Sequence, residues 1–172
     1  MPPETQRFYG KYRGVCINNL DPERRGRIQA MVPDVTGSIP TSWALPCVPV
    51  AGPGMGFYAV PPMNASVWIE FEGGNPDHPI WSGGFWDSMA EVPALAQTVL
   101  PGTAAFVLQT TATNALVISD MPGPTGGVMI QLVSGATVMI NDINIVINNG
   151  KGAVITMTGN MVDVNTGALT VM

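Results

Sequence analysis

The chain has 172 residues, of which 46% are hydrophobic and only 11% are charged, and its formal net charge is −5. Globular proteins carry about 25% charged residues, so the surface is either rich in uncharged polar residues or covered by other chains. No window approaches the roughly 18 to 20 apolar residues of a membrane-spanning helix. Residues 1–7 also lack the apolar stretch of a signal peptide, so we expect cytoplasmic synthesis without export by the general route.

The basic residues are concentrated at the start of the chain. Six of the seven precede residue 28, and the seventh is Lys151. A nucleic-acid-binding surface needs cations along its contact area, and residues 28–150 contain none. We therefore expect no nucleic acid as a partner. The N-terminal cations have two interpretations, namely a site for an acidic partner or charged strand edges that oppose aggregation.

Residues 1–7 are predicted to form an N-terminal arm and residues 8–90 a small β domain. Alternation is clearest after residue 66, where Val67, Ile69 and Phe71 face one way and Trp68 and Glu70 the other. Five short strands in about 80 residues, separated by Gly- and Pro-rich connections, suit a closed barrel of the OB type. We expect these strands near residues 8–19, 25–33, 43–50, 65–72 and 78–86.

Catalytic and metal chemistry find little support. Cys16 and Cys47 each lie in an apolar strand-like run, so we expect buried, inert thiols without a disulfide. His78 is the single histidine, which excludes a metal site built from several histidines. It lies among residues that are typical of turns. Glu70 and Glu72 share a strand face, which superficially resembles a paired-carboxylate site, but carboxylates on the solvent face of a strand are commoner. We therefore expect no enzyme, no cofactor and no metal.

Aromatic side chains are frequent in the same region. They could form a base-stacking surface like that of nucleic-acid-binding OB folds, or they could pack the core and the contacts between subunits. The lack of nearby cations in the sequence favours packing. The residues concerned are Trp43, Trp68, Trp81, Phe85 and Trp86.

Residues 91–102 are predicted to be a linker. Ser88-Met-Ala-Glu91 has the form of a capping box, but Pro93 would fall inside the helix that it begins and remove a hydrogen bond. We expect a short, broken helical turn here.

Residues 103–172 have a different sequence pattern, in which short apolar runs recur roughly every seven to ten residues and are separated by Gly, Asn, Asp or Ser. This spacing is typical of a β-solenoid. The repeats are too short to give one chain its own core, and a strand of about five residues has one buried face and two open edges. Three chains wound about one axis would pair the edges and bury the Val and Ile residues. The runs begin at Phe106, Leu116, Val128, Val138, Ile143, Ala153, Val162 and Leu169.

The order of motifs over residues 8–90 resembles the spike proteins of contractile injection machines, namely phage baseplate assembly protein V and VgrG-type spikes. A Gly-Arg-hydrophobic strand ending in Val-Pro comes first, followed by a Trp-Ala-x-Pro segment, a Gly-rich loop, a Val-Trp strand and a Pro-rich hairpin. The matching segments are Gly26-Arg-Ile-Gln-Ala-Met-Val-Pro33, Trp43-Ala-Leu-Pro46, Ala51-Gly-Pro-Gly54, residues 67–72 and residues 74–83.

The resemblance implies an all-β homotrimer, with an N-terminal OB-fold barrel followed by a C-terminal intertwined triple-stranded β-helix over residues 103–172. It implies a baseplate hub, a PAAR-repeat tip protein and, transiently, the target cell envelope as partners, and assembly in a bacterial cytoplasm into a tail or tail-like particle. Candidate hub-binding residues are Arg7, Lys11, Arg13, Arg24 and Arg25. Candidate tip-binding residues are Ala168, Leu169, Thr170, Val171 and Met172.

Two departures bear on this expectation. Some members of the family hold iron in a His-x-His apex, and this chain has no histidine after His78, so we expect a blunt, metal-free end. Some members also carry a lysozyme domain, for which this chain has no counterpart. The alternative interpretation is an OB-fold module that binds carbohydrate or nucleic acid and carries a trimerising β-stalk.

Overall fold

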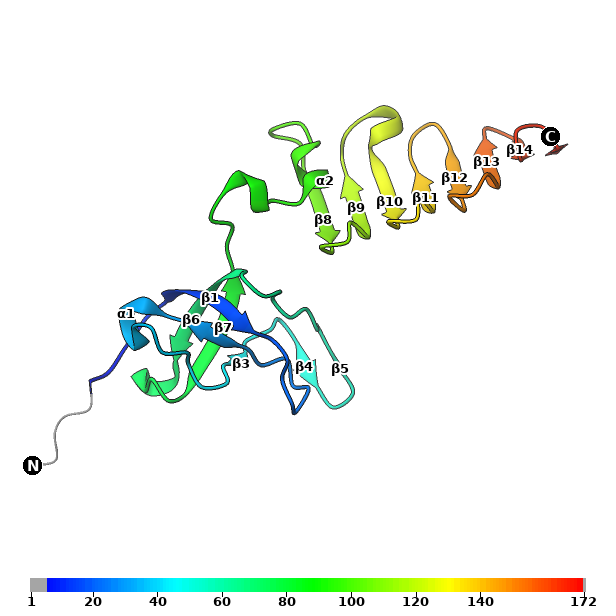
Figure 1. Ribbon diagram of the computed structural model, residues 1–172. Helices are drawn as coiled ribbons and strands as arrows, with labels where there is room; N and C mark the ends of the chain where they lie inside the picture. The colour runs from blue at the N-terminus through cyan, green and yellow to red at the C-terminus, as the bar shows by residue number, and fades with distance from the viewer. Residues whose placement is uncertain (1–5, 172) are drawn as a thin grey trace, which may run out of the picture. The chain divides into compact units, whose positions relative to one another are not determined.

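The computed structural model describes residues 6–171, with only the backbone of Thr170 (Figure 1). It divides into two compact units, the first ending at Met89 and the second beginning at Ala90. The fold is all-β, and its two α-helical segments have four residues each. Among the described residues, no helix has the length and apolar character needed to span a membrane.

The N-terminal unit is built on a five-stranded sheet with the order β2-β1-β6-β7-β3. All of its pairings are antiparallel except that between β3 and β7. Two further strands, β4 and β5, form a separate hairpin. The strands are β1 (Tyr12–Asn18), β2 (Gln29–Met31), β3 (Leu45–Pro46), β4 (Ala51–Gly52), β5 (Met55–Gly56), β6 (Ser66–Phe71) and β7 (Pro79–Gly84).

Each of the five expected strands is present, but several are shorter than the sequence suggested. The third shrinks to Leu45–Pro46, because Pro46 and Pro49 cannot donate to a ladder. The second begins only at Gln29, because Asp21 accepts the backbone N–H groups of Arg25 and Arg27. It ends before Pro33, which opens the helical turn α1 (Pro33–Thr36). The expected Gly-rich loop contains the hairpin β4–β5.

The core of the N-terminal unit follows the predicted alternation. Val67 and Ile69 are fully buried and Phe71 is 6% exposed, and all three project from one face of β6. Cys16 is fully buried with them, and burial raises the pKa of its thiol. Cys47 is exposed, so the prediction that both thiols are buried is wrong for this residue. Its backbone N–H bonds to the carbonyl of Trp81 at the sheet edge, which leaves the side chain directed outward.

The 3-10 turn η2 (Met89–Glu91) spans the division between the two units, and the helix α2 (Ala94–Gln97) follows in the second. Pro93 stands at the N-cap of α2 rather than inside a helix, so the helical segment is broken at the proline. A further 3-10 turn, η3 (Gly123–Thr125), lies between two of the strands that follow.

The rest of this unit is one sheet of eight strands in which each strand pairs antiparallel with the next. Each of the eight apolar runs seen in the sequence overlaps one strand. The strands are β8 (Ala105–Gln109), β9 (Ala115–Ser119), β10 (Gly127–Gln131), β11 (Thr137–Ile140), β12 (Ile145–Asn148), β13 (Val154–Thr158), β14 (Met161–Val164) and β15 (Leu169–Val171).

This topology corrects one step of the argument for a trimer. The inner strands β9 to β14 find partners for both edges within their own chain, so open edges are not what they offer to other chains. The eight-stranded sheet instead leaves one of its two faces uncovered.

Candidate functional site

The register of the C-terminal sheet puts sixteen apolar side chains on one face, which we call the apolar face. They form two rows of cross-strand pairs, and neither row is interrupted by a polar residue. One row is Phe106, Ile118, Val128, Ile140, Ile145, Met157, Val162 and Val171. The other is Leu108, Leu116, Ile130, Val138, Ile147, Ile155, Val164 and Leu169.

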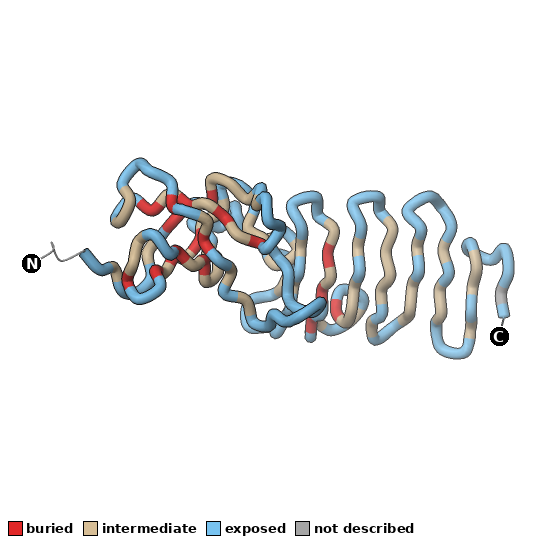
Figure 2. The backbone as a smooth tube through the Cα atoms, turned by 90° about the horizontal axis from the view of Figure 1, so that it is seen from below, coloured by how far each residue is buried: buried red, intermediate tan, exposed pale blue. Residues whose placement is uncertain are grey.

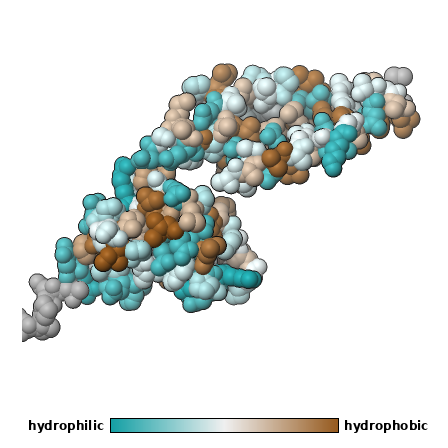
Figure 3. All heavy atoms as spheres, viewed as in Figure 1, coloured by the Kyte–Doolittle hydropathy of each residue, from teal (hydrophilic) through white to brown (hydrophobic). Residues whose placement is uncertain are grey.

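The single chain does not bury this face. Ten of the sixteen side chains are exposed, from 36% for Val162 to 58% for Leu169, and the others are half-buried. Figure 2 shows buried residues concentrated in the N-terminal unit, while the C-terminal unit is mostly exposed or intermediate. Space-filling atoms likewise show apolar residues at the surface of the second unit (Figure 3). An apolar stripe of this length is far more than a monomeric protein normally leaves in water.

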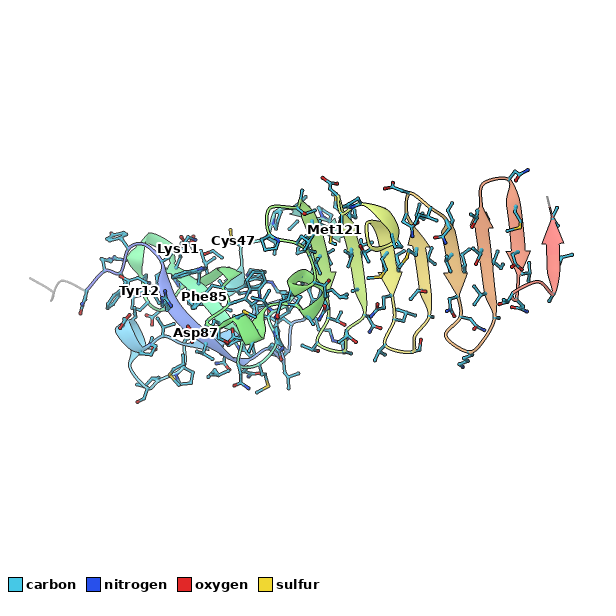
Figure 4. All side chains as sticks on the ribbon, turned by 90° about the horizontal axis from the view of Figure 1, so that it is seen from above. Lys11, Tyr12, Cys47, Phe85, Asp87 and Met121 are labelled. Carbon is cyan, nitrogen blue, oxygen red and sulfur yellow. The ribbon has the colours of Figure 1, made fainter. Side chains whose placement is uncertain are left out.

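The opposite face of the same sheet is mixed in character. It carries Gln109, Gln131, Thr137, Asn148 and Asp163 among apolar residues that include several methionines. Figure 4 shows side chains projecting to both sides of the strands. Near β8 this face is covered by α2, whose Leu95 N–H donates to Oε1 of Gln109 at 3.3 Å. The two faces therefore differ, and only the apolar face lacks both polar residues and cover.

The predicted hub-binding residues Lys11 and Arg13 lie on the outer face of the N-terminal sheet. Nζ of Lys11 is 3.1 Å from a carboxylate oxygen of Glu70 and donates to Oγ of Ser82 at 2.7 Å. The Arg13 guanidinium lies 3.9 Å from Asp87. It also stacks over two aromatic rings, with its carbon 5.5 Å from the Trp68 centroid and 4.9 Å from that of Phe85. Figure 4 labels Lys11, Phe85 and Asp87 in this unit.

The other predicted hub-binding residues occupy two further places. Arg7 donates to the carbonyl of Gly73 at 3.2 Å, next to the β6–β7 turn. Arg24 and Arg25 lie together in the loop between β1 and β2, where Arg25 pairs with Glu23 at 3.1 Å. Among the residues that the structure describes, no carboxylate lies within ion-pair distance of Arg24. The five cations thus form three separate groups, and three of them pair with carboxylates of their own chain.

The interactions that fix the loop between β1 and β2 were not predicted from the sequence. The side chain of Asp21 is only 4% exposed, and one of its oxygens is 2.7 Å from Nη2 of Arg27. Its carboxylate also accepts the backbone N–H groups of Glu23, Arg25 and Arg27. The Arg27 guanidinium therefore holds the pKa of Asp21 well below its usual range. The only signal in the sequence was an Asp-Pro turn followed six residues later by arginine.

The aromatic residues do have cations nearby, contrary to the sequence expectation. Arg13 lies over Trp68 and Phe85, and the guanidinium carbon of Arg27 is 5.6 Å from the Trp43 ring centroid. Each of these cations is also within ion-pair distance of a carboxylate. Trp81 is buried, and its Nε1–H donates to the carbonyl of Gly26 at 3.0 Å. These contacts fit packing better than base stacking, because the neighbouring carboxylates would repel phosphates.

The predicted tip-binding segment includes the last strand, β15. Its pairing with β14 joins Leu169 to Val164 and Val171 to Val162, and its other edge has no partner strand within the described residues. Leu169 and Val171 belong to the apolar face and are 58% and 56% exposed. Met172 lies outside the described residues. No group of acidic, cysteine or histidine side chains in the described range could hold a metal ion.

Comparison with protein families agrees with this geometry. Residues 12–86 match the model of the Type VI secretion system/phage-baseplate injector OB domain. Residues 105–170 match that of the phage baseplate V C-terminal trimerisation domain. A comparison with curated proteins found no match.

An OB barrel followed by a trimerising β domain with one uncovered apolar face defines a structural baseplate protein. The two matches occur in the family's own order and together span most of the chain. The chain belongs to the phage baseplate V family of spike proteins.

Proposed function

We propose that this protein is the central spike of a contractile injection machine, in which three copies form a β-spike by packing the apolar faces of their C-terminal sheets on a common axis. The observation that carries the proposal is the pair of uninterrupted apolar rows. Three equivalent sheets facing one axis remove all of these rows from water in a closed assembly. The family's trimerisation domain coincides with the strands that carry the rows.

The OB barrel of the N-terminal unit seats on the baseplate hub through its cations. Arg7, Lys11, Arg13, Arg24 and Arg25 are the contact residues that we propose. Electrostatic complementarity of this kind raises association rates more than final affinity. Because Lys11, Arg13 and Arg25 already pair with their own carboxylates, Arg7 and Arg24 contribute most of the uncompensated charge.

The C-terminal end carries a tip protein of the PAAR-repeat type. Ala168, Leu169, Thr170, Val171 and Met172 are the residues that we propose for this contact. Support comes from the outer edge of β15, which has no partner strand within the described residues and would otherwise invite aggregation.

The spike acts mechanically and without catalysis. It is assembled in a bacterial cytoplasm, becomes part of a tail or tail-like particle, and transmits force to the target envelope when the sheath contracts. Both matched families are structural baseplate domains, which supports this reading.

The test is the oligomeric state of the full chain, measured by light scattering at micromolar concentration. A trimer is the expected result. A folded monomer would refute the spike proposal, because its apolar face would then be stable in water.

A further inference from the structure

The N-terminal unit has a groove between its basic loop and its separate hairpin. The groove has a volume of about 500 Å³. Arg24, Arg25 and Gly26 form one side, and the hairpin residues from Val50 to Val60 form most of the other, with Trp81 also in the lining. Both elements belong to the same unit (Figure 1).

The cationic side of the groove is held rigidly. Asp21 fixes the loop through Arg27 and three backbone N–H groups, and Nε1–H of Trp81 donates to the carbonyl of Gly26. Between these anchors Arg24 has a φ of 53°, in the left-handed region. A non-glycine residue in that region is uncommon, and such strain tends to be retained at functional positions.

The hairpin side is apolar and uncovered. Residues 50–59 contain no charged side chain, and every one of them is exposed. The exposed fractions of Val50, Met55 and Tyr58 are 47%, 65% and 72%. A two-stranded hairpin is marginally stable by itself, so this surface gains most from being covered by another chain.

We propose that this groove receives an extended segment of the baseplate hub, which places an apolar side chain against the hairpin and a carboxylate beside Arg24 and Arg25. The charge pattern selects the partner: Arg24 lacks a carboxylate partner among the described residues, and the hairpin offers only apolar contact. The inference rests on the proposed seating of the barrel on a hub and assigns that seating to one surface.

The test measures binding of the full-length trimer to the immobilised hub subunit isolated from the same machine, at low and at high salt. Reversing the rim charge with Arg24→Glu and Arg25→Glu should lower the association rate roughly tenfold at low salt and weaken its salt dependence. Filling the groove with Ala51→Trp should instead speed dissociation roughly tenfold, because most loss of affinity appears in that rate. Matched controls are Lys151→Glu and Ala112→Trp, at exposed turns of the second unit, which should bind as the wild type does.

The outcomes separate the two proposals. If the wild-type trimer does not bind the hub, the seating of the barrel is wrong and this inference fails with it. If the wild type binds and the groove variants bind at the same rates, the seating stands and the groove is not the hub site. If the groove variants instead dissociate the isolated trimer in light scattering while the controls do not, a second copy of this chain fills the groove, and the hub assignment is overturned.

Discussion

The apolar face makes a sharp prediction about Ile155 and Thr158, which lie on the same strand, β13, but face opposite ways. Ile155 sits in the second apolar row between Ile147 and Val164 and is 38% exposed in the single chain. Thr158 lies on the mixed face and is exposed as well. An aspartate at either position would therefore meet water in a monomer, whereas only the variant at Ile155 would be buried in the trimer.

The size of the effect follows from what trimer formation removes from water. A half-exposed aliphatic side chain gains about 1 kcal/mol on full burial, and burying an unpaired carboxylate costs several kcal/mol more. A conservative sum is about 3 kcal/mol per copy and 9 kcal/mol per trimer. Since each 1.4 kcal/mol is a factor of ten, Ile155→Asp should raise the dissociation constant of the trimer by about six orders of magnitude.

The pH dependence provides an internal check. Burial and the proximity of three like charges would raise the pKa of the introduced carboxyl groups in the trimer. Trimer stability is then present below the ordinary aspartate pKa of about 4 and is lost as the pH rises through the raised value. Light scattering should find Ile155→Asp dissociated at neutral pH and at least partly trimeric near pH 4. The control Thr158→Asp should remain trimeric at both. Equal trimer stability of the two variants at neutral pH would refute the assignment of the apolar face.

Four further predictions concern other parts of the chain. Trp81→Phe removes the donor to Gly26 and should destabilise the barrel by about 1 kcal/mol, seen as a lower melting temperature of the barrel; an unchanged melting temperature would show that this bond contributes nothing. Because the pKa of Asp21 is lowered, its stabilisation is present above the usual aspartate range and is lost only as the pH falls through the lowered value. Asp21→Asn should therefore speed hydrogen exchange at the three amides that it binds, and equal exchange would contradict its role. Elemental analysis should find no stoichiometric iron or zinc in the purified trimer. Deleting residues 168–172 should abolish binding of the tip protein while the trimer persists, and retained binding would place the tip contact elsewhere.

Local patterns predicted the fold well because they depend on neighbours in sequence. The alternation of Val67, Ile69 and Phe71 with polar or half-buried residues is a property of a single strand, and the structure buries the expected side. The eight apolar runs likewise became eight strands. Pro93 was correctly expected to break the helical segment, since a missing N–H acts within one turn.

Features that depend on distant partners were missed. The ion pair of Asp21 and Arg27 forms only when the loop between β1 and β2 folds back on itself. The periodicity of apolar residues does not predict such a contact. Cys47 lies in an apolar run and was expected to be buried, yet it directly follows the short edge strand β3 and is exposed. The pairing of consecutive strands in the second unit also escaped prediction, because apolar runs mark strands without stating which strands adjoin.

The absence of polar residues from the two apolar rows explains how the short, similar strands of the second unit keep one pairing register. Side chains alternate between the faces, so a slip of one residue moves a whole strand's set to the other face. Such a slip in β14 would turn Asp163 inward, and one in β10 would turn Gln131 inward. The other charged residues after residue 102, Asp120, Asp142 and Lys151, all lie between strands. In a trimer each error would bury three polar groups on one axis, at a cost of at least about 1 kcal/mol each. The rows thus define the register as well as the core, and the scarcity of charge in this segment allows both.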